Sequence, residues 1–496
     1  MAVADSSKPF SYDLEVCTLV NNEGEGFDLR KVFGGIKIHE SITQNFLLGE
    51  IGIVDSTGLL ENARIFGQET LRIRFKSPFG LEDEMDDEDV IDQIFRIYNV
   101  GQVQRVGQNT LIYNLKFCSP ELLQAKRIRV SQALRGSLTN MAAQLAEDHL
   151  GIKVENKNKK LTPYFEVREK SSEENFQIVI PNWSVNYAMN YLIGEAQGTK
   201  EGSGLQDCFF FYQTANAGFR IQSLDSMMRV DYLNGDPFVY TPADQGDPQK
   251  IPWDNVEPGR MGMGRRILSY QILSTARVLE GTVNGFFGSK QITVDNTFQY
   301  HHDRSYSYLD KFYQGKGQAM NDHPLVRTTD ETMYIGEAAD QEESGDLVGG
   351  SYAEYKNISS YGNANVLLLS DRHYVNDEKN KINQPSHNAH EGQEQYRQAL
   401  DQLLKYYKIQ ILLPVRTDIS VGSLINLEID AVRPGEESHS EAYFHTGKHL
   451  ITDIMWELTL DECKTHITVI KDSLINQIET TVPELPQRLE ADDSGG

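Results

Sequence analysis

Two distant parts of this chain are weak copies of one another, each with a glycine turn, an alternating strand, a loop and two closing strands. The first copy has its glycine at Gly67 and strand patterns at residues 65–75, 96–100 and 110–119. The second copy has its glycine at Gly422 and strand patterns at residues 420–429, 449–454 and 466–473. Alternation of apolar and polar residues is typical of half-buried strands. Two similar β-modules in one chain favour a quasi-symmetric structural component over an enzyme built around a single pocket.

The length and the distribution of apolar residues constrain the class of protein. A chain of 496 residues is long enough for three or four domains, each with its own core. It contains no run of about 18 apolar residues, so we expect no membrane span. Its start lacks the cationic and apolar regions of a signal peptide. Four widely separated cysteines argue against a disulfide framework or a zinc site, and we expect synthesis in a reducing cytoplasm with buried free thiols.

The formal net charge is −25. Proteins that grip nucleic acid need clusters of Lys and Arg that neutralise phosphates, so this charge disfavours nucleic-acid binding. An acidic surface would instead let a polyanion pass without adhering to it. The alternative is that the charge only aids solubility, and the composition does not separate these two explanations.

The N-terminal region, residues 10–122, has the pattern of a β-module. Gly49 and Gly52 fall within one strand pattern, where glycine suits a bulge or a close strand approach. The acidic run 82–89 lies between two strand patterns. It lacks the ligand order and central glycine of an EF-hand, so we interpret it as a solvated hairpin loop rather than a calcium site.

Residues 123–205 change to an α/β pattern and look like an insertion into the first module. Apolar residues at helical spacing run from Leu134 to Leu145. Ser184 is placed to cap a second helix that follows it. The chain then returns to strands at 208–212 and 219–225, joined by a turn at 216–218.

The second half of the chain alternates between β-rich and polar stretches. Residues 236–264 form a linker rich in Asp, Pro and Gly, and strand patterns follow at 267–272 and 281–285. Residues 301–395 are polar and irregular, which predicts a loop-rich domain. A helical stripe at 396–407 leads into the second copy of the repeat, and the last residues, 476–496, are predicted to form a flexible tail.

Candidate chemical residues are few. His301 and His302 are adjacent and are followed by Asp303, but neighbours in a strand face opposite sides and rarely share one metal ion. His387 and His390 lie in a polar loop. The glycines of 259–264 do not follow the Gly-x-Gly-x-x-Gly order, and no catalytic or phosphate-binding motif occurs. We therefore predict no catalytic, cofactor-binding or metal-binding residues and no cofactor.

Several segments carry a family resemblance. They are the strand pattern 176–183 with the helix that follows it, the aromatic strand 209–212, the strand 218–225, and the first-module patterns at 35–40 and 118–123. With these segments the chain resembles the baseplate central hub proteins of contractile-tailed bacteriophages. Those proteins are related in fold to the hub part of type VI secretion spikes. The resemblance covers the N-terminal half and the last 80 residues or so of the chain.

The resemblance implies a mainly β fold with α+β insertions. Each chain would carry two tube-type β-barrel modules, an inserted α/β domain and a loop-rich domain, and three chains would form a pseudo-hexameric homotrimer. The expected domains are the first module at 10–122 and 206–235, the insertion at 123–205, the linker at 236–264, the second module at 265–300 and 408–475, the loop-rich domain at 301–407 and the tail at 476–496.

The implied function is structural. Six similar modules would match a hexameric tail tube above and a three-fold spike below. The expected partners are a tail tube protein, a spike protein and other baseplate proteins, in the tail baseplate of a virion. DNA would pass through the lumen without specific binding. The expected contact surfaces are the strands near residues 71–75, 111–117, 425–429 and 467–470, and exposed sheet edges in the two modules would pair or pack around the ring.

Two other functions stay open at this point. One is a tail-associated cell-wall hydrolase with its chemistry in the 301–395 region, for which His301, His302, Asp303 and His323 are the first candidates. The other is a type VI-like secretion spike component, although fused needle repeats are missing from the sequence.

Overall fold

The computed structural model describes most of the β-rich regions of the chain. The described residues are 10–77, 90–154, 164–167, 176–196, 208–216, 218–229, 237–240, 265–275, 277–295, 300–314, 319–325, 365–370, 374–377, 382–385, 393–429 and 445–476. The acidic run 82–89, the glycines of 259–264, His387, His390 and the segment 477–496 lie outside these ranges. No helix in the described part of the chain is long and apolar enough to cross a membrane.

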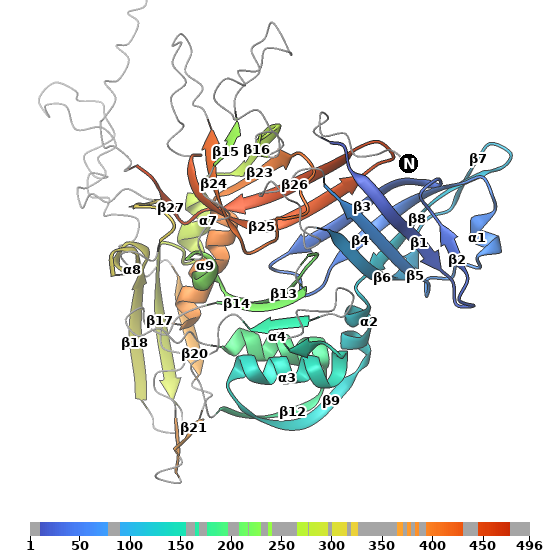
Figure 1. Cartoon of the computed structure of the whole chain (residues 1–496). Coiled ribbons are helices and arrows are strands. Elements are labelled where there is room, and N and C mark those ends of the chain that lie inside the picture. The colour runs from blue at the N-terminus through green and yellow to red at the C-terminus, as the bar shows by residue number, and fades with distance from the viewer. Residues whose placement is uncertain are drawn as a thin grey trace, which may run out of the picture.

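One large sheet of fourteen strands organises the molecule (Figure 1). Its main path runs β16-β23-β26-β25-β3-β4-β8-β6-β5-β1-β2, and β24, β15 and β7 are paired beside this path. Neighbouring strands along the main path are antiparallel. The strands alternate between buried and less buried positions because one set of side chains faces the core.

A five-strand unit occurs twice in this sheet. The first unit comprises β3 (Phe33–Ser41), β4 (Leu48–Asp55), β5 (Thr70–Lys76), β6 (Ile91–Val100) and β8 (Thr110–Cys118). The second unit comprises β16 (Ser269–Ser274), β23 (Lys408–Leu413), β24 (Leu424–Ile429), β25 (Gly447–Leu458) and β26 (Cys463–Ile470). In both units the first strand pairs with the second, the second with the fifth, the fifth with the fourth and the fourth with the third.

The two units agree in register as well as in strand order. In the first unit a bulge falls at Tyr98, between the pairs made by Ile97 and Asn99. In the second unit the corresponding bulge falls at Thr452, between the pairs made by Ile451 and Asp453. The repeat predicted from the sequence is therefore present in the backbone. A shared bulge position means that the two units bend at the same point.

The two expected tube-type barrels correspond to two units of one large sheet, because β25 pairs on the same side with β24 through its first residues and with β3 through its last ones. Among the described residues the sheet as a whole is not closed, but in the second unit β15 pairs with β24 and its Val239 forms a bridge with Arg266, just before β16. The remaining strands of this sheet are β1 (Asp13–Val20), β2 (Gly26–Asp28), β7 (Gln104–Val106) and β15 (Phe238–Tyr240). The short helix α1 (Leu59–Asn62) connects β4 to β5.

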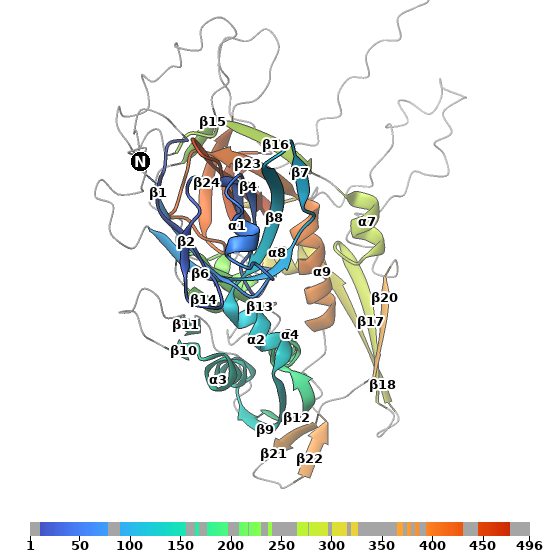
Figure 2. The same cartoon turned by 90° about the vertical axis from the view of Figure 1, so that its right-hand side faces the viewer.

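The inserted region has its own core beneath the large sheet (Figure 2). It contains α2 (Pro120–Arg127), β9 (Arg129–Gly136), α3 (Leu138–Leu150), β10 (Lys153–Val154), β11 (Tyr164–Val167), β12 (Phe176–Ser184), α4 (Val185–Glu195), β13 (Phe209–Thr214), β14 (Gly218–Ser223) and α5 (Leu224–Met227). The Ser184 side chain accepts a hydrogen bond from the Tyr187 N–H, as expected for the cap of α4. Helix α3 begins only at Leu138, because Ser137 caps it and Leu134 belongs to β9.

The hairpin β13–β14 was expected in the first module but pairs elsewhere. Strand β14 pairs with β11, and the four-stranded sheet runs β10-β11-β14-β13. The physical reason is that Phe209, Phe211 and Phe219 are buried in the core of the inserted region, against α3 and α4. The boundaries of the predicted domains otherwise stay predictions.

A third group of elements lies to one side of the large sheet (Figure 2). It contains α7 (Val278–Val283), β17 (Gly288–Asp295), β18 (Tyr300–Ser307), α8 (Tyr308–Gln314), β19 (His323–Pro324), β20 (Val366–Ser370), β21 (Tyr374–Asp377), β22 (Ile382–Pro385) and α9 (Gln393–Tyr406). The strand expected at 281–285 is not formed. Residues 281–283 belong to the helix α7 instead. Strand β17 pairs with β18 and β20 rather than with the second unit. The helical stripe expected at 396–407 is confirmed as α9, and β19 pairs with β27 (Ser473–Leu474).

At Gly49 in β4 the neighbouring strands β3 and β8 approach closely, and a substitution there tests this packing. A Cβ atom at Gly49 would lie 2.4 Å from the carbonyl oxygen of Lys37 and 2.4 Å from the ring of Phe117. We expect Gly49→Ala to lower the free energy of unfolding by about 1–3 kcal/mol, because the backbone of β3 must move. The control is Gly194→Ala in α4, where no atom lies within 4 Å of the added Cβ and alanine favours the helix. Urea unfolding curves measure both, and equal effects would contradict the interpretation.

Candidate functional site

The joint between β3 and β25 is the place where the two five-strand units meet. Six residue pairs, from Asp453–Ser41 to Leu458–Ile36, join the strands in antiparallel register. Ile36, Ile38 and Trp456 are fully buried at this joint. The indole N–H of Trp456 donates to the carbonyl oxygen of Arg416 at 2.7 Å. Buried apolar contact and a continuous hydrogen-bonded ladder therefore hold the two units as one sheet.

Polar contacts lie at one end of this joint and on its more exposed face. The Ser41 hydroxyl donates to Asp453 Oδ1 at 2.6 Å, and the Ile42 N–H donates to the carbonyl oxygen of Thr452 at 3.0 Å. On the more exposed face, Lys37 Nζ lies 3.6 Å from Glu457 Oε1. Such a partly exposed ion pair contributes little to stability, so the ladder and the buried side chains carry the joint.

Glu40 is a buried carboxylate that ties three parts of the chain together. Its Oε2 accepts the N–H of Ala215, from the turn between β13 and β14, at 2.8 Å. Its Oε1 accepts the N–H of Val421, from the glycine turn of the second unit, also at 2.8 Å. Burial raises the pKa of Glu40 to about 7, against the two backbone N–H groups and nearby Arg220, which lower it. The carboxylate thus connects the first unit, the inserted region and the second unit.

The sequence contains a signal for Glu40 that the pattern analysis did not use. Ile36, Ile38 and Glu40 share one face of the same strand, since residues two apart point to the same side. The two isoleucines mark that face as buried, so a carboxylate at the next position on it requires partners. Those partners come from residues far along the chain, and sequence reasoning alone does not find them.

The hairpin β13–β14 binds both units from below. The side-chain Oε1 of Gln213 accepts the Leu47 N–H at 3.1 Å and the Ser119 hydroxyl at 2.5 Å, which links the hairpin to the first unit just before β4 and just after β8. The Arg220 guanidinium donates to the Ser420 hydroxyl at 3.2 Å, which links it to the second unit. The aromatic side chains of the hairpin therefore pack in the core of the inserted region, whereas its polar side chains bind the two units beside the joint.

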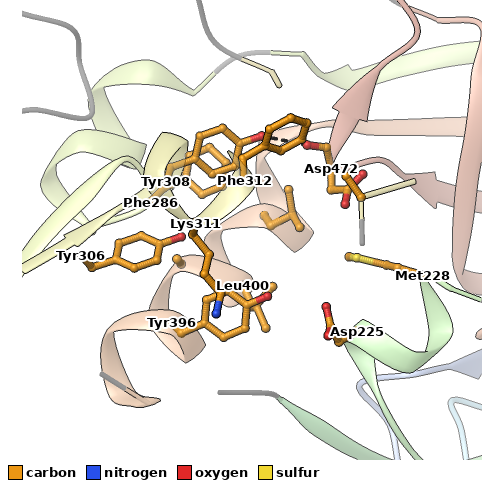
Figure 3. A pocket seen from close by; sticks show the side chains of 13 residues that line it. Asp225, Met228, Phe286, Tyr306, Tyr308, Lys311, Phe312, Tyr396, Leu400 and Asp472 are labelled. Atoms are coloured by element: carbon orange, nitrogen blue, oxygen red, sulfur yellow. Dashed lines mark hydrogen bonds between the residues drawn. The ribbon is translucent and has the colours of Figure 1, made fainter. Parts of the chain in front are cut away.

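A small cavity of about 80 Å³ lies below the second unit (Figure 3). Aromatic side chains of β18, α8 and α9 line it, together with Met228, Asp225 and Asp472. The Tyr308 hydroxyl donates to the Asp472 carbonyl oxygen at 2.9 Å. Burial raises the pKa of Asp472 to about 6. The cavity is far smaller than the pockets that hold drug-sized ligands. The hydrogen bonds around it join the third group of elements to Asp472, which lies just after β26.

The structure separates the residues considered for a hydrolase. His301 is exposed on β18 and pairs with Val294, and Asp303 forms an ion pair with Lys290 at 2.8 Å. His302, one position on, pairs with Thr293 on β17. His323 is in β19, which pairs with β27 in a different sheet. Within the described ranges, no three His, Cys, Asp or Glu residues come together as metal ligands would.

The strands expected to offer exposed edges are interior strands. Strand β5 lies between β1 and β6, and β8 lies between β4 and β6. Likewise β24 has β15 and β25 as neighbours, and β26 has β23 and β25. These four strands therefore have a neighbouring strand on each side within the chain and are not themselves sheet edges.

Comparisons with known proteins give distant similarities of fold. No protein-family model and no curated protein sequence matches the chain. The 43 kDa tail protein of prophage MuSo2 from Shewanella oneidensis matches with 9% identity and a TM-score of 0.46, covering 92% of this chain and 98% of that one. A tail protein from Neisseria meningitidis MC58 matches with 9% identity and a TM-score of 0.46, covering 93% and 96%.

A type VI secretion protein matches too. The E. coli c3393 protein, described as similar to the T4 bacteriophage tail proteins gp27 and gp5, shows 8% identity and a TM-score of 0.36, covering 95% of this chain and 79% of that one. These neighbours come from the two groups that the sequence resembles, phage tail proteins and type VI secretion components.

The buried Glu40 predicts a specific pH dependence. Because its pKa in the folded protein lies above the ordinary value of 4.5, its contribution to stability is fully present below pH 4.5 and declines as the pH rises through about 7. In Glu40→Gln this decline disappears. We therefore expect the fall in unfolding free energy between pH 5 and pH 8 to be smaller in the variant by roughly 2–3 kcal/mol.

Denaturant unfolding at the two pH values measures this difference. Glu50→Gln is the matched control, since Glu50 is a partly exposed residue on the neighbouring strand β4. An unchanged pH dependence in Glu40→Gln would show that Glu40 is ionised at little cost in the folded protein.

Proposed function

We propose that this chain is a structural hub of a contractile phage tail, which assembles as a homotrimer and joins a six-fold tail tube to a three-fold spike. One observation carries the proposal: the chain contains the same five-strand unit twice, in the same register, joined into one continuous sheet. Three such chains present six similar units in a ring. A six-fold partner needs six near-equivalent surfaces, and a chain with a single unit would leave half of them unmatched in a trimer.

The proposed hub surrounds a channel through which DNA passes. The net charge of −25 supports passage rather than binding, because phosphates meet few unneutralised cations. Its proposed partners are the tail tube protein, the spike protein and other baseplate proteins. The role is structural and needs neither a catalytic site nor a cofactor.

Particle mass and shape test this proposal. We expect light scattering to give three times the chain mass of 56.2 kDa and negative-stain class averages to show a six-lobed ring with a central hole. Addition of a tail tube protein is expected to lengthen the particle along its axis. A protein that stays monomeric at every concentration and never assembles with the tube protein would overturn the proposal.

A zymogram separates the hub from a cell-wall hydrolase. We expect no clearing band in a peptidoglycan gel, with lysozyme as the positive control, since His301, Asp303 and His323 are not assembled into one site. A clearing band that is lost in His302→Ala would contradict the structural role.

A further inference from the structure

The inserted region carries a stripe of three aromatic side chains that are only partly buried. Trp183 near the end of β12 and Tyr187 and Tyr191 in α4 follow one another at intervals of four residues, which places them on one side of the helix. The ring centroid of Trp183 lies 4.9 Å from that of Tyr187 and 5.1 Å from that of Tyr191. Tyr187 is 55% exposed, the largest value for a tyrosine in the described part of the chain. Partly exposed tryptophan and tyrosine side chains that contact one another are typical of protein interfaces.

A bulge in β12 orients Trp183 within this stripe. Strand β12 pairs with β9, and the register shifts by one residue between Ile180 and Trp183. Asn182, inside the bulge, has a φ of 55°, in the left-handed region that residues other than glycine rarely adopt. The extra residue places Trp183 opposite the buried Val130, so the indole lies on the side of the ribbon that faces α4. A strained backbone residue therefore sets the position of Trp183, and such residues are concentrated at functional sites.

Exposed cations lie beside the aromatic stripe. Lys126 and Arg127 end α2, Arg129 begins β9, and all three side chains are exposed. Arg129 pairs with Ser184, whose hydroxyl accepts the N–H of Tyr187 at 3.3 Å. Helix α2 also packs against α4 and β12, and Figure 2 shows these elements next to one another. The three cations and the three aromatic residues therefore form one aromatic–basic surface.

The positive charge of this surface is not neutralised by the described residues. Neither Arg127 nor Arg129 has a carboxylate among them at ion-pair distance, whereas Arg72 of the first unit lies 2.9 Å from Asp92. Glu121, the acidic residue of α2, is buried and does not reach the exposed side. A local positive surface contrasts with the net charge of −25 for the whole chain. Unpaired guanidinium groups beside tryptophan and tyrosine fit a partner that supplies carboxylates.

We propose that the aromatic–basic surface docks an acidic segment of another protein, with carboxylates of the partner on Arg127 and Arg129 and an apolar side chain of the partner against Tyr187. A guanidinium group binds a carboxylate through two parallel hydrogen bonds, and tyrosine and tryptophan supply large, rigid contact areas. Nucleic acid is a poorer fit, because three cations neutralise few phosphates and the net charge repels a polyanion of that length. The inference goes beyond the proposed hub, since neither the ring nor its channel requires this surface.

A synthetic acidic copolymer tests the chemistry of the surface. A random copolymer of glutamate and tyrosine supplies both carboxylates and apolar rings. Added to the full-length protein, it is expected to change the tryptophan fluorescence, because Trp183 is partly exposed whereas Trp456 is fully buried. The change is expected to disappear in Trp183→Phe, which identifies its source. Binding is expected to weaken as salt is added and to be stronger than that of polyglutamate, which lacks apolar rings.

A pair of charge reversals tests the role of the arginines. In the double variant Arg127→Glu with Arg129→Glu, the affinity for the copolymer is expected to fall by at least about tenfold, because the charge pairs are lost. The matched control is Arg105→Glu with Lys116→Glu, which reverses two exposed cations of the first unit and changes the net charge equally. Its affinity is expected to stay close to that of the native protein, and circular dichroism checks that both variants fold. An equal loss in the two variants would reveal only general attraction by charge and would overturn the proposal.

The aromatic stripe has its own matched pair of variants. Tyr187→Ala is expected to weaken binding of the copolymer by about tenfold, as truncation of an interface anchor does. Tyr98→Ala is the control, since Tyr98 is a 44% exposed tyrosine on β6, outside the aromatic–basic surface. A folded Tyr187→Ala variant that binds as well as the native protein would assign the stripe to the packing of α4 alone and contradict the docking site.

Two other occupants of the surface are separated by the same variants. Duplex DNA that displaces the copolymer and binds more tightly than it does would make this a nucleic-acid surface and overturn the proposal. A particle mass that falls in Arg127→Glu with Arg129→Glu, measured by light scattering, would show that a second copy of this chain covers the surface, which also overturns it. Loss of copolymer binding with an unchanged particle mass supports the proposal. That result holds for a trimer or a monomer, so it is independent of the proposed hub.

Discussion

The antiparallel ladder between β3 and β25 is the interaction on which the rest of the structure depends. It converts two similar five-strand units, which residues 119–268 separate in the sequence, into one sheet with one continuous core. Backbone groups of a buried strand must be paired, so β25 has its second neighbour supplied first by β24 and then by β3. The inserted region and the third group of elements then attach to this frame through the Gln213, Arg220 and Asp472 contacts.

Glu40 shows how the joint is fixed in place. A buried carboxylate is costly, and its raised pKa reflects that cost. Two N–H groups from separate turns have Glu40 as their acceptor, and an unpaired buried N–H would also be unfavourable. The two hydrogen bonds thus offset part of the free-energy cost of burying Glu40, and they hold three segments of the chain together. An apolar residue at this position would pack but would leave both turns without an acceptor.

The local patterns predict much of this architecture. The repeat of strands, the helical stripe of α9 and the Ser184 cap all depend on residues close in sequence, and they are present in the structure. Local patterns do not predict how a segment folds where its packing or pairing partner is distant in the sequence. The aromatic strand β13 pairs in the inserted region because its rings match that core, and residues 278–283 form a helix despite their β-branched residues. The strands expected as contact surfaces are interior strands for the same reason, since the pairing partners of a strand cannot be read from its own residues.

The sequence by itself determined that the chain has two copies of one β-unit, because alternation and turn glycines are properties of neighbouring residues. It also determined the acidic character that disfavours binding to DNA. Only the tertiary structure decided that the copies share one sheet and that Glu40 connects three distant parts of the chain. The physical reason is that strand pairing satisfies backbone groups, which are the same in every residue, so the choice of partner depends on what the whole fold brings alongside.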